Sequence, residues 1–188
     1  MAQSWDAFIS YARAESASEA AALQVGIERF AKPWNRLRAC RVFRDDASMS
    51  ANAGLWSAIE RALTDSRYLI LILSRAAAKS NYVDNEVQWW LQHKSSETVL
   101  LVHDDGALAW DRASNRFSSD TDCVPPALVD AYREEPRWLD FSWFDHEGSL
   151  RTSDPRFTGV VADLASPIRG IERDELIGDN VALDATDR

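Results

Sequence analysis

The stretch RYLILILSRAAAKSNYVDNEVQWWL, residues 67–91, decides the fold of this chain. It opens with an unbroken apolar run over residues 68–73, with a serine and an arginine on either side. A run this short and rich in Leu and Ile is typical of a strand buried on both faces. The helical pattern that follows places Tyr82, Glu86 and Trp89 on one stripe. The stretch therefore predicts a central strand that leads into a helix carrying a carboxylate between two aromatic side chains.

Other segments of the chain alternate between strand and helix patterns in the same way. Besides residues 68–73, the sequence predicts strands at 6–11, 38–43, 98–103 and 138–143. It predicts helices whose apolar stripes are Leu23, Ile27, Phe30 and Trp34 in the first, Leu55, Ile59 and Leu63 in the second, and Phe157, Val161 and Leu164 in the last. The last helix is expected at residues 154–168, with Asp154 as its N-cap. A long polar connection at 104–126 precedes a short helix at 127–132.

Five strands that alternate with helices predict an α/β domain. We expect a flavodoxin-like, five-stranded parallel sheet of order 2-1-3-4-5 with helices on both faces. Ligands of such sheets bind at the carboxyl ends of the strands, near the point between strands 1 and 3 where the connections diverge. The segments that follow the first three strands meet at this edge. They bring together Tyr11, Arg13, Asp45, Asp46, Tyr82 and Glu86.

The composition narrows the classes of function. The chain has 188 residues, 46% of them hydrophobic, which suits one domain, expected over residues 1–168, and a linker or flexible tail at 169–188. A formal net charge of −9 argues against a nucleic acid or an anionic membrane as partner. Two cysteines, no signal peptide and no apolar run of about 20 residues favour a cytoplasmic domain that makes no membrane contact of its own.

Several common catalytic and binding motifs are absent from the sequence. It contains no glycine-rich dinucleotide motif, no P-loop, no Cys or His pattern of a metal site, and no nucleophile elbow of an α/β-hydrolase. Asp45 and Asp46 lack the further carboxylates or histidines of a metal site, so no metal is expected. A phosphoacceptor receiver domain would need an aspartate at the end of the third strand. This chain has Leu73, Ser74 and Arg75 there, so the receiver class is rejected.

Three segments, in this order, resemble the TIR (Toll/interleukin-1 receptor) domain. They are DAFISY at residues 6–11, RVFRDDASMSAN at 41–52 and SRYLILILSRAAAKSNYVDNEVQWWL at 66–91. Within that family the chain is most similar to bacterial TIR domains that form the N-terminal domain of larger defence or signalling proteins. The resemblance implies the flavodoxin-like fold. It also implies one of two functions, because many bacterial and plant members cleave NAD+ at the nicotinamide–ribose bond and others act only as TIR–TIR adhesion modules.

The resemblance assigns roles to residues at the predicted edge. Glu86 matches the family's catalytic glutamate. Tyr82 stands four residues earlier, at the position of an aromatic, usually Trp, that lines the pocket for ribose and nicotinamide. Tyr11 and Arg13 match the loop after the first strand, whose aromatic and basic groups contact the dinucleotide. Asp45 begins the BB loop, which closes over the site, and is also an expected substrate contact.

The BB loop, residues 45–52, mediates assembly in the family, which implies other TIR domains as partners. Its expected interface residues are Ser48, Met49, Ser50 and Asn52. Met49 is the expected apolar anchor because its neighbours are Ser and Ala. Asn52 stands where many members have Gly, and Asn tolerates a left-handed backbone better than most residues. We therefore expect the loop to keep its shape.

Physical chemistry supports a catalytic role for Glu86, although most surface glutamates are merely solvated. Cleavage of an N-glycosidic bond passes through an oxocarbenium-like state, which a carboxylate stabilises while it holds the ribose hydroxyls. Nicotinamide leaves a cationic ring as a neutral molecule, so no strong general acid is needed. We therefore expect an NAD+ nucleosidase, activated by self-association in a bacterial immune or signalling response, with NAD+ as substrate and no cofactor.

Two alternatives stay open at this point. The chain could be a scaffold whose BB loop and helices bind other TIR domains, with an incidental Glu86. If it is an enzyme, its product could be linear or cyclic ADP-ribose. An assay of nicotinamide release from NAD+ by concentrated protein distinguishes the enzyme from the scaffold.

Overall fold

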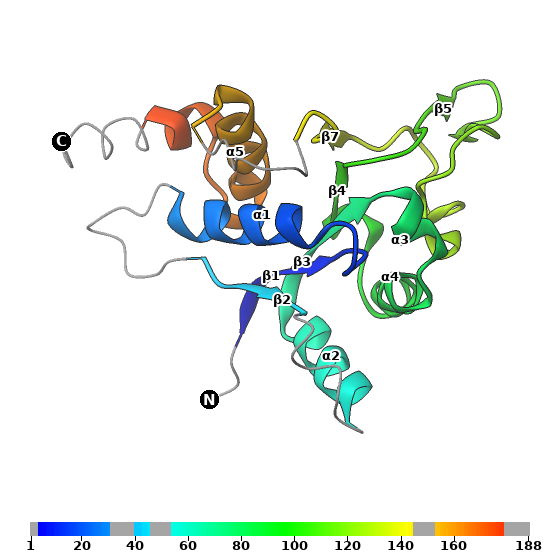
Figure 1. Cartoon of the computed structure of the whole chain (residues 1–188), viewed down its shortest axis with the longest axis horizontal. Coiled ribbons are helices and arrows are strands. Elements are labelled where there is room, and N and C mark those ends of the chain that lie inside the picture. The colour runs from blue at the N-terminus through cyan, green and yellow to red at the C-terminus, as the bar shows by residue number, and fades with distance from the viewer. Residues whose placement is uncertain (1–3, 31–39, 46–53, 145–152, 179–188) are drawn as a thin grey trace.

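A computed structural model describes residues 4–30, 40–45, 54–144 and 153–178. At its centre lies a five-stranded sheet of order β2-β1-β3-β4-β7, in which all neighbouring strands are parallel (Figure 1). Its strands are β1 (Trp5–Ser10), β2 (Val42–Arg44), β3 (Ser66–Leu73), β4 (Val99–His103) and β7 (Trp138–Asp140). With β7 as the fifth strand, this is the order 2-1-3-4-5, so the predicted fold class is confirmed.

Helices cover both faces of the sheet (Figure 1). One face carries α1 (Ala17–Arg29) and α5 (Pro155–Arg169). The other face carries α2 (Leu55–Thr64), α3 (Arg75–Lys79) and α4 (Asn81–His93). Two short 3₁₀ helices, η2 (Ser96–Thr98) and η3 (Pro126–Leu128), lie in the connections around β4. The sheet is therefore the middle of three layers.

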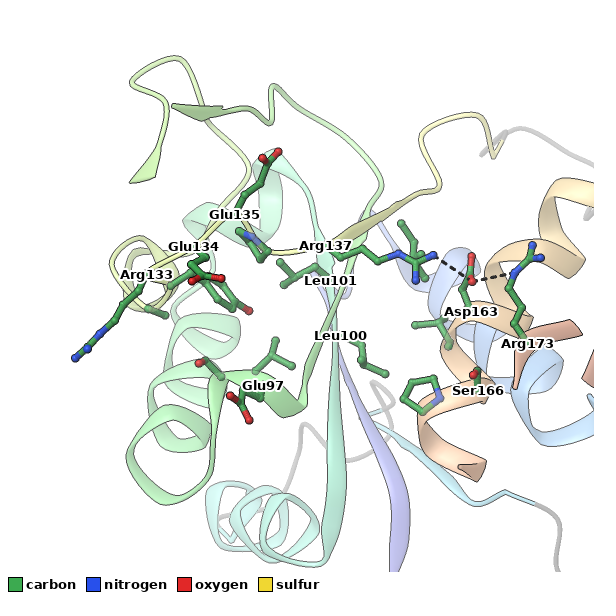
Figure 2. A pocket seen from close by; sticks show the side chains of 18 of the residues that line it. Glu97, Leu100, Leu101, Arg133, Glu134, Glu135, Arg137, Asp163, Ser166 and Arg173 are labelled. Atoms are coloured by element: carbon green, nitrogen blue, oxygen red, sulfur yellow. Dashed lines mark ion pairs between the residues drawn. The ribbon is translucent and has the colours of Figure 1, made fainter. Parts of the chain in front are cut away.

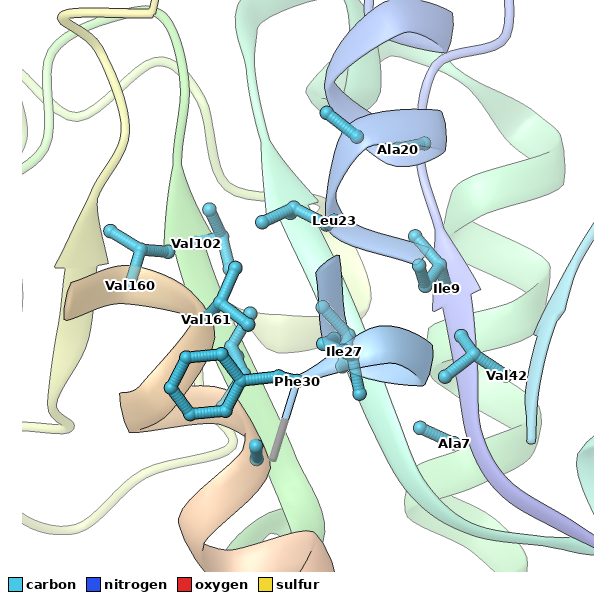
Figure 3. Close-up of a cluster of buried hydrophobic side chains, with 14 of the residues drawn as sticks. Ala7, Ile9, Ala20, Leu23, Ile27, Phe30, Val42, Val102, Val160 and Val161 are labelled. Carbon is cyan, nitrogen blue, oxygen red and sulfur yellow. The ribbon is translucent and has the colours of Figure 1, made fainter. Parts of the chain in front are cut away.

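The central strand β3 is buried on both faces, as its apolar run predicts. Ile70 and Ile72 belong to the hydrophobic cluster under α1 and α5, part of which Figure 3 shows. Leu69, Leu71 and Leu73 belong to the cluster under α2, α3 and α4. All five side chains are fully buried. At about 1.5–3 kcal/mol for each buried aliphatic side chain, these five contribute on the order of 10 kcal/mol of favourable burial energy.

The two helices on one face approach each other closely at Gly26. A Cβ atom at this position would lie 2.8 Å from Val161 Cγ2 and 3.1 Å from Phe157 Cζ. Both of these side chains are buried on α5, where dense packing leaves them little room to move. Glycine at this position therefore allows the contact that holds α1 and α5 together over the sheet. Ile27 of α1 and Val161 of α5 belong to the same buried cluster, part of which Figure 3 shows.

The strand β7 is shorter than the strand predicted at residues 138–143. Phe141 still donates its N–H to His103 O at 2.8 Å, but the chain then turns, and the N–H of Phe144 bonds to Phe141 O at 3.0 Å. The turn buries both phenylalanine rings, which stack with their centroids 4.6 Å apart. Burial of these rings in the core ends the strand earlier than the alternating pattern suggests.

The connection at 104–126 is not irregular throughout. It contains a small antiparallel pair, β5 (Trp110–Asp111) and β6 (Arg116–Phe117), whose turn includes Asn115 at a φ of 54°. The short helix predicted at 127–132 is the single 3₁₀ turn η3. The predicted second strand begins at Val42, and Trp34 of the first helical stripe lies outside the described residues.

The described part of the predicted tail packs on the domain. α5 begins after Asp154, whose side chain accepts a hydrogen bond from the Arg156 N–H, as predicted for an N-cap, and it ends at Gly170 with a φ of 64°. Residues 173–178 form a further helical turn, and Leu176 is fully buried in the cluster under α1 and α5. The domain boundary at residue 168 stays a prediction. Among the described residues, no helix is both long enough and apolar enough to cross a bilayer.

Candidate active site

A pocket of about 430 Å³ opens at the carboxyl ends of β1, β2 and β3, the edge that the sequence analysis predicts. Its lining includes Tyr11, Arg13, Asp45, Tyr82 and Glu86. These five side chains come from three separate segments of the chain: the end of β1, the end of β2, and α4. The fold therefore brings together every predicted catalytic and substrate-binding residue, while their roles stay a prediction.

Glu86 is the buried acid of this pocket. It lies on α4 and is only 4% exposed. The hydroxyl of Ser10, the last residue of β1, donates a hydrogen bond to Glu86 Oε2. Burial raises the pKa of Glu86 to about 7, although the Ser10 hydrogen bond and the charge of Arg13 act in the opposite direction. A carboxyl group that titrates near neutral pH inside a pocket is typical of a catalytic site.

Arg13 and Asp45 form an ion pair across the mouth of the pocket. Asp45 is 2% exposed, and the Arg13 side chain is 24% exposed. The Tyr11 hydroxyl donates to the backbone carbonyl of Asp45 at 2.6 Å, which ties the loop after β1 to the end of β2. The guanidinium that the resemblance assigns to the dinucleotide is therefore neutralised by a carboxylate in this structure.

Tyr82 lies at the rim of the pocket. Its side chain is 56% exposed, in the first turn of α4. The guanidinium carbon of Arg13 lies 5.2 Å from the centre of the Tyr82 ring, which is a cation–π contact. Trp89, on the same stripe, does not line the pocket. It is buried between α2 and α4, where its indole N–H donates to Glu60 Oε1 at 3.1 Å.

The remaining predicted residues cannot be placed. Asp46, Ser48, Met49, Ser50 and Asn52 all lie outside the described residues. The closing and assembly roles of the BB loop stay predictions.

Sequence reasoning gave no role to Ser10, which makes the closest polar contact to Glu86. The signal was present in the alternation of β1. Phe8 belongs to the cluster on the α4 side of the sheet, and Ser10, two residues later, faces the same side. A serine that ends a buried strand on the face covered by α4 is a candidate partner for a group on that helix. Lys79, the last residue of α3, and Ser80, the N-cap of α4, also line the pocket and were not singled out.

A larger groove of about 1160 Å³ lies beside the start of β4 (Figure 2). It opens because β7 begins opposite Leu101 and leaves the first residues of β4 uncovered on that side. Three of its charged side chains pair within the groove, since Asp163 contacts Arg137 at 3.2 Å and Arg173 at 2.9 Å (Figure 2). Size favours this groove, but the buried, titratable carboxyl of Glu86 favours the smaller pocket as the site of chemistry.

The pocket offers hydrogen-bonding and ionic contacts. Across the described ranges, no three His, Cys, Asp or Glu side chains are grouped so as to hold a metal ion. The described lining presents the carboxylates of Glu15, Asp45 and Glu86, the cations of Arg13 and Lys79, and two tyrosine rings. That set can stabilise a developing positive charge and bind sugar hydroxyls and phosphates.

Measurements of the free energy of unfolding test the raised pKa of the buried Glu86 carboxyl independently of any activity. Its pKa rises from 4.5 to about 7 on folding, so the folded domain binds this proton more tightly than the unfolded chain. The stabilisation of the folded state by this tighter proton binding is fully present below pH 4.5 and is lost as the pH rises through about 7. Glu86→Gln removes the titration. Compared with wild type, it should gain on the order of 3 kcal/mol of unfolding free energy between pH 4 and pH 8.

Urea unfolding of both proteins at the two pH values measures this difference. Glu97→Gln, which removes an exposed glutamate at the other end of the sheet, serves as the matched control and should show no such change. If wild type and Glu86→Gln differ equally at both pH values, Glu86 is not a desolvated acid.

Comparison with known proteins now places the chain in a family. The pattern described as "Thoeris protein ThsB, TIR-like domain" matches residues 8–108, more than half of the chain. Over 178 residues the chain is 37% identical to the NAD(+) hydrolase ApTIR of Actinoplanes sp., a match that covers 94% of this chain and 25% of that protein. The chain thus spans about a quarter of the length of the curated relative that it matches. The sheet order and the matched segment agree, and the chain belongs to the family of bacterial TIR-like domains.

Proposed function

We propose that this domain is an NAD+ glycohydrolase that cleaves the nicotinamide–ribose bond. The observation that carries the proposal is the carboxyl of Glu86, buried in a pocket at the carboxyl ends of β1, β2 and β3 and titrating near neutral pH. The name of the similar protein, NAD(+) hydrolase ApTIR, supports the same activity.

In this reaction the bond between ribose C1′ and the nicotinamide nitrogen breaks, and its electron pair stays on the nitrogen. The ribose ring develops oxocarbenium character, and water then attacks C1′ and loses a proton to solvent. The Glu86 carboxylate stabilises the positive charge and accepts hydrogen bonds from the ribose hydroxyls. Because the carboxylate is the active form, activity requires a pH near or above the Glu86 pKa of about 7.

The other pocket residues bind the rest of the dinucleotide. Arg13 binds the diphosphate, for which it must leave or share Asp45. Tyr82 packs against the nicotinamide ribose from the rim, and Tyr11 fixes the backbone of Asp45 at the root of the BB loop. The ion pair between Arg13 and Asp45 preserves the shape of the pocket and lowers the affinity of the pocket for a second anion.

Removal of the Glu86 carboxylate should abolish the reaction. Glu86→Gln and Glu86→Ala should release nicotinamide at least about 100-fold more slowly than wild type, because neither side chain can stabilise the cationic transition state. Liquid chromatography of concentrated protein with NAD+ measures the rate, and circular dichroism checks the fold. Glu97→Gln, an exposed glutamate far from the pocket, should keep the wild-type rate. Wild-type turnover by Glu86→Gln would contradict the catalytic role assigned to the Glu86 carboxylate.

Tyr82 tests the rim of the pocket. Tyr82→Ala should lower turnover about tenfold, because a packed aromatic ring holds the nicotinamide ribose in place. Tyr82→Trp should keep or raise turnover, and Tyr82→Phe, which keeps the ring and loses the hydroxyl, is the matched control for ring packing. The side chain is 56% exposed, so none of the three should unfold the domain. If the alanine variant is as fast as wild type, Tyr82 makes no contact that matters for catalysis.

We further propose that self-association activates the domain, through a BB loop of one protomer that helps to complete the pocket of the next. Such head-to-tail contacts are heterologous and build open assemblies. Turnover per protomer should rise with protein concentration, and Met49→Asp should weaken this rise without unfolding the domain. A dilution series of nicotinamide release measures both. Constant turnover per protomer, unchanged by Met49→Asp, would mean that the monomer holds a complete site.

The competing function is a TIR–TIR scaffold in a bacterial immune or signalling response. In that case the protein associates with concentration but releases no nicotinamide at any concentration. Sedimentation velocity measures association over the same dilution series, and together with nicotinamide release it distinguishes the scaffold from the enzyme. The products, linear or cyclic ADP-ribose, separate on the same chromatogram.

A further inference from the structure

Ser10 is a rigid neighbour of the proposed catalytic carboxylate. It is the last residue of β1 and is 1% exposed. Its backbone pairs with Leu71 of the central strand, and the preceding residue, Ile9, pairs with Arg44 of β2. A strand held on both sides cannot shift its terminal side chain easily. The Ser10 hydroxyl is therefore a fixed reference point for the Glu86 carboxyl, to which it donates a hydrogen bond.

The two oxygens of Glu86 differ in what holds them. Oε2 accepts the hydrogen bond from Ser10. Among the described residues no hydrogen bond reaches Oε1, although Glu86 lines the pocket. A glutamate has three rotatable side-chain bonds, so a single anchored oxygen removes most of its freedom. The anchored oxygen thus directs the other one toward the space where a substrate would lie.

We propose that Ser10 is a positioning residue for the proposed reaction, whose hydroxyl fixes the orientation of the Glu86 carboxylate and stabilises its ionised form. This inference rests on the proposed NAD+ glycohydrolase activity. Ser10 acts through Glu86 and is not itself assigned a contact with the substrate.

The other charged groups around Glu86 do not replace this hydrogen bond. The ionisable side chains that line the pocket are Tyr11, Arg13, Glu15, Asp45, Lys79 and Tyr82. Of these, Arg13 is engaged with Asp45 and stabilises the Glu86 charge only at a distance. On α2, one of the helices that pack against α4, Glu60 accepts a hydrogen bond from the Trp89 indole N–H. After burial, the Ser10 hydrogen bond has the largest effect on the Glu86 pKa, and it lowers that pKa.

Loss of the hydroxyl should therefore raise the Glu86 pKa further above 7. In Ser10→Ala, the acid limb of the kcat–pH profile should move up by about one pH unit, because a hydrogen bond to a charged group is lost. At pH 7 this shift alone lowers kcat about fivefold, with KM changed by less than about threefold. At alkaline pH part of the loss should remain, because the freed carboxylate is no longer oriented.

Two matched variants accompany Ser10→Ala. Ser66→Ala removes another buried serine hydroxyl, at the opposite end of β3, where it donates to Ala62 O, and should leave the profile unchanged. Ser10→Thr keeps a donor at the same position and should restore most of the activity. If Ser10→Ala shows the wild-type acid limb, or if Ser66→Ala shifts it equally, the positioning role is refuted.

A titration that needs no activity separates this inference from the proposed function. The carboxyl carbon of Glu86, followed by ¹³C NMR in ¹³C-glutamate-labelled protein and identified with Glu86→Gln, reports its pKa directly. A higher Glu86 pKa in Ser10→Ala than in wild type supports the coupling, and equal values overturn it. If the NMR pKa moves while wild type releases no nicotinamide at any concentration, the proposed activity fails and with it the catalytic meaning of Ser10. If the NMR pKa moves and the acid limb does not, another group limits the rate and the positioning role is overturned.

Discussion

The burial of β3 on both faces is the constraint on which the rest of the structure depends. A strand with apolar side chains on both sides is stable only when one helical layer covers each face. α1 and α5 cover one side, and α2, α3 and α4 cover the other. This central position also gives β3 a strand partner on each edge, β1 and β4. The carboxyl end of β3 therefore opens into the edge where β1 and α4 meet, and the pocket forms at that point.

The pocket combines charges that the fold holds in unequal surroundings. Glu86 is buried with a serine hydroxyl as its closest partner, whereas Arg13 and Asp45 compensate each other at the mouth. Desolvation without a paired cation raises the pKa of the glutamate, and the ion pair keeps the nearby positive charge from cancelling that effect. Such a difference between neighbouring groups lets one pocket hold a carboxyl that titrates near neutral pH beside a paired cation.

The periodicity of the sequence was sufficient to predict the fold and the part of the pocket that α4 supplies. The apolar run of β3 and the helical stripe of Tyr82 and Glu86 are local patterns, and local patterns can be read from one sequence. The bond from Ser10 to Glu86 and the pair of Arg13 with Asp45 join residues far apart in the chain, and no periodic pattern encodes their contact. The shorter length of β7 could not be predicted for a related reason. The burial of Phe141 against other elements ends the strand, although the alternating pattern of the sequence continues.

The shortness of β7 has a consequence for the behaviour of the protein in solution. Val99 and Leu100 begin β4 before β7 starts to pair with it, and no described strand covers that side of them. An open sheet edge can template pairing with another chain, which is a common origin of aggregation. The neighbouring side chains include Glu97, Glu134 and Arg137, and charged residues of this kind discourage such pairing. These charges therefore protect one stretch of open sheet edge, and neutralising them would favour its pairing with another chain.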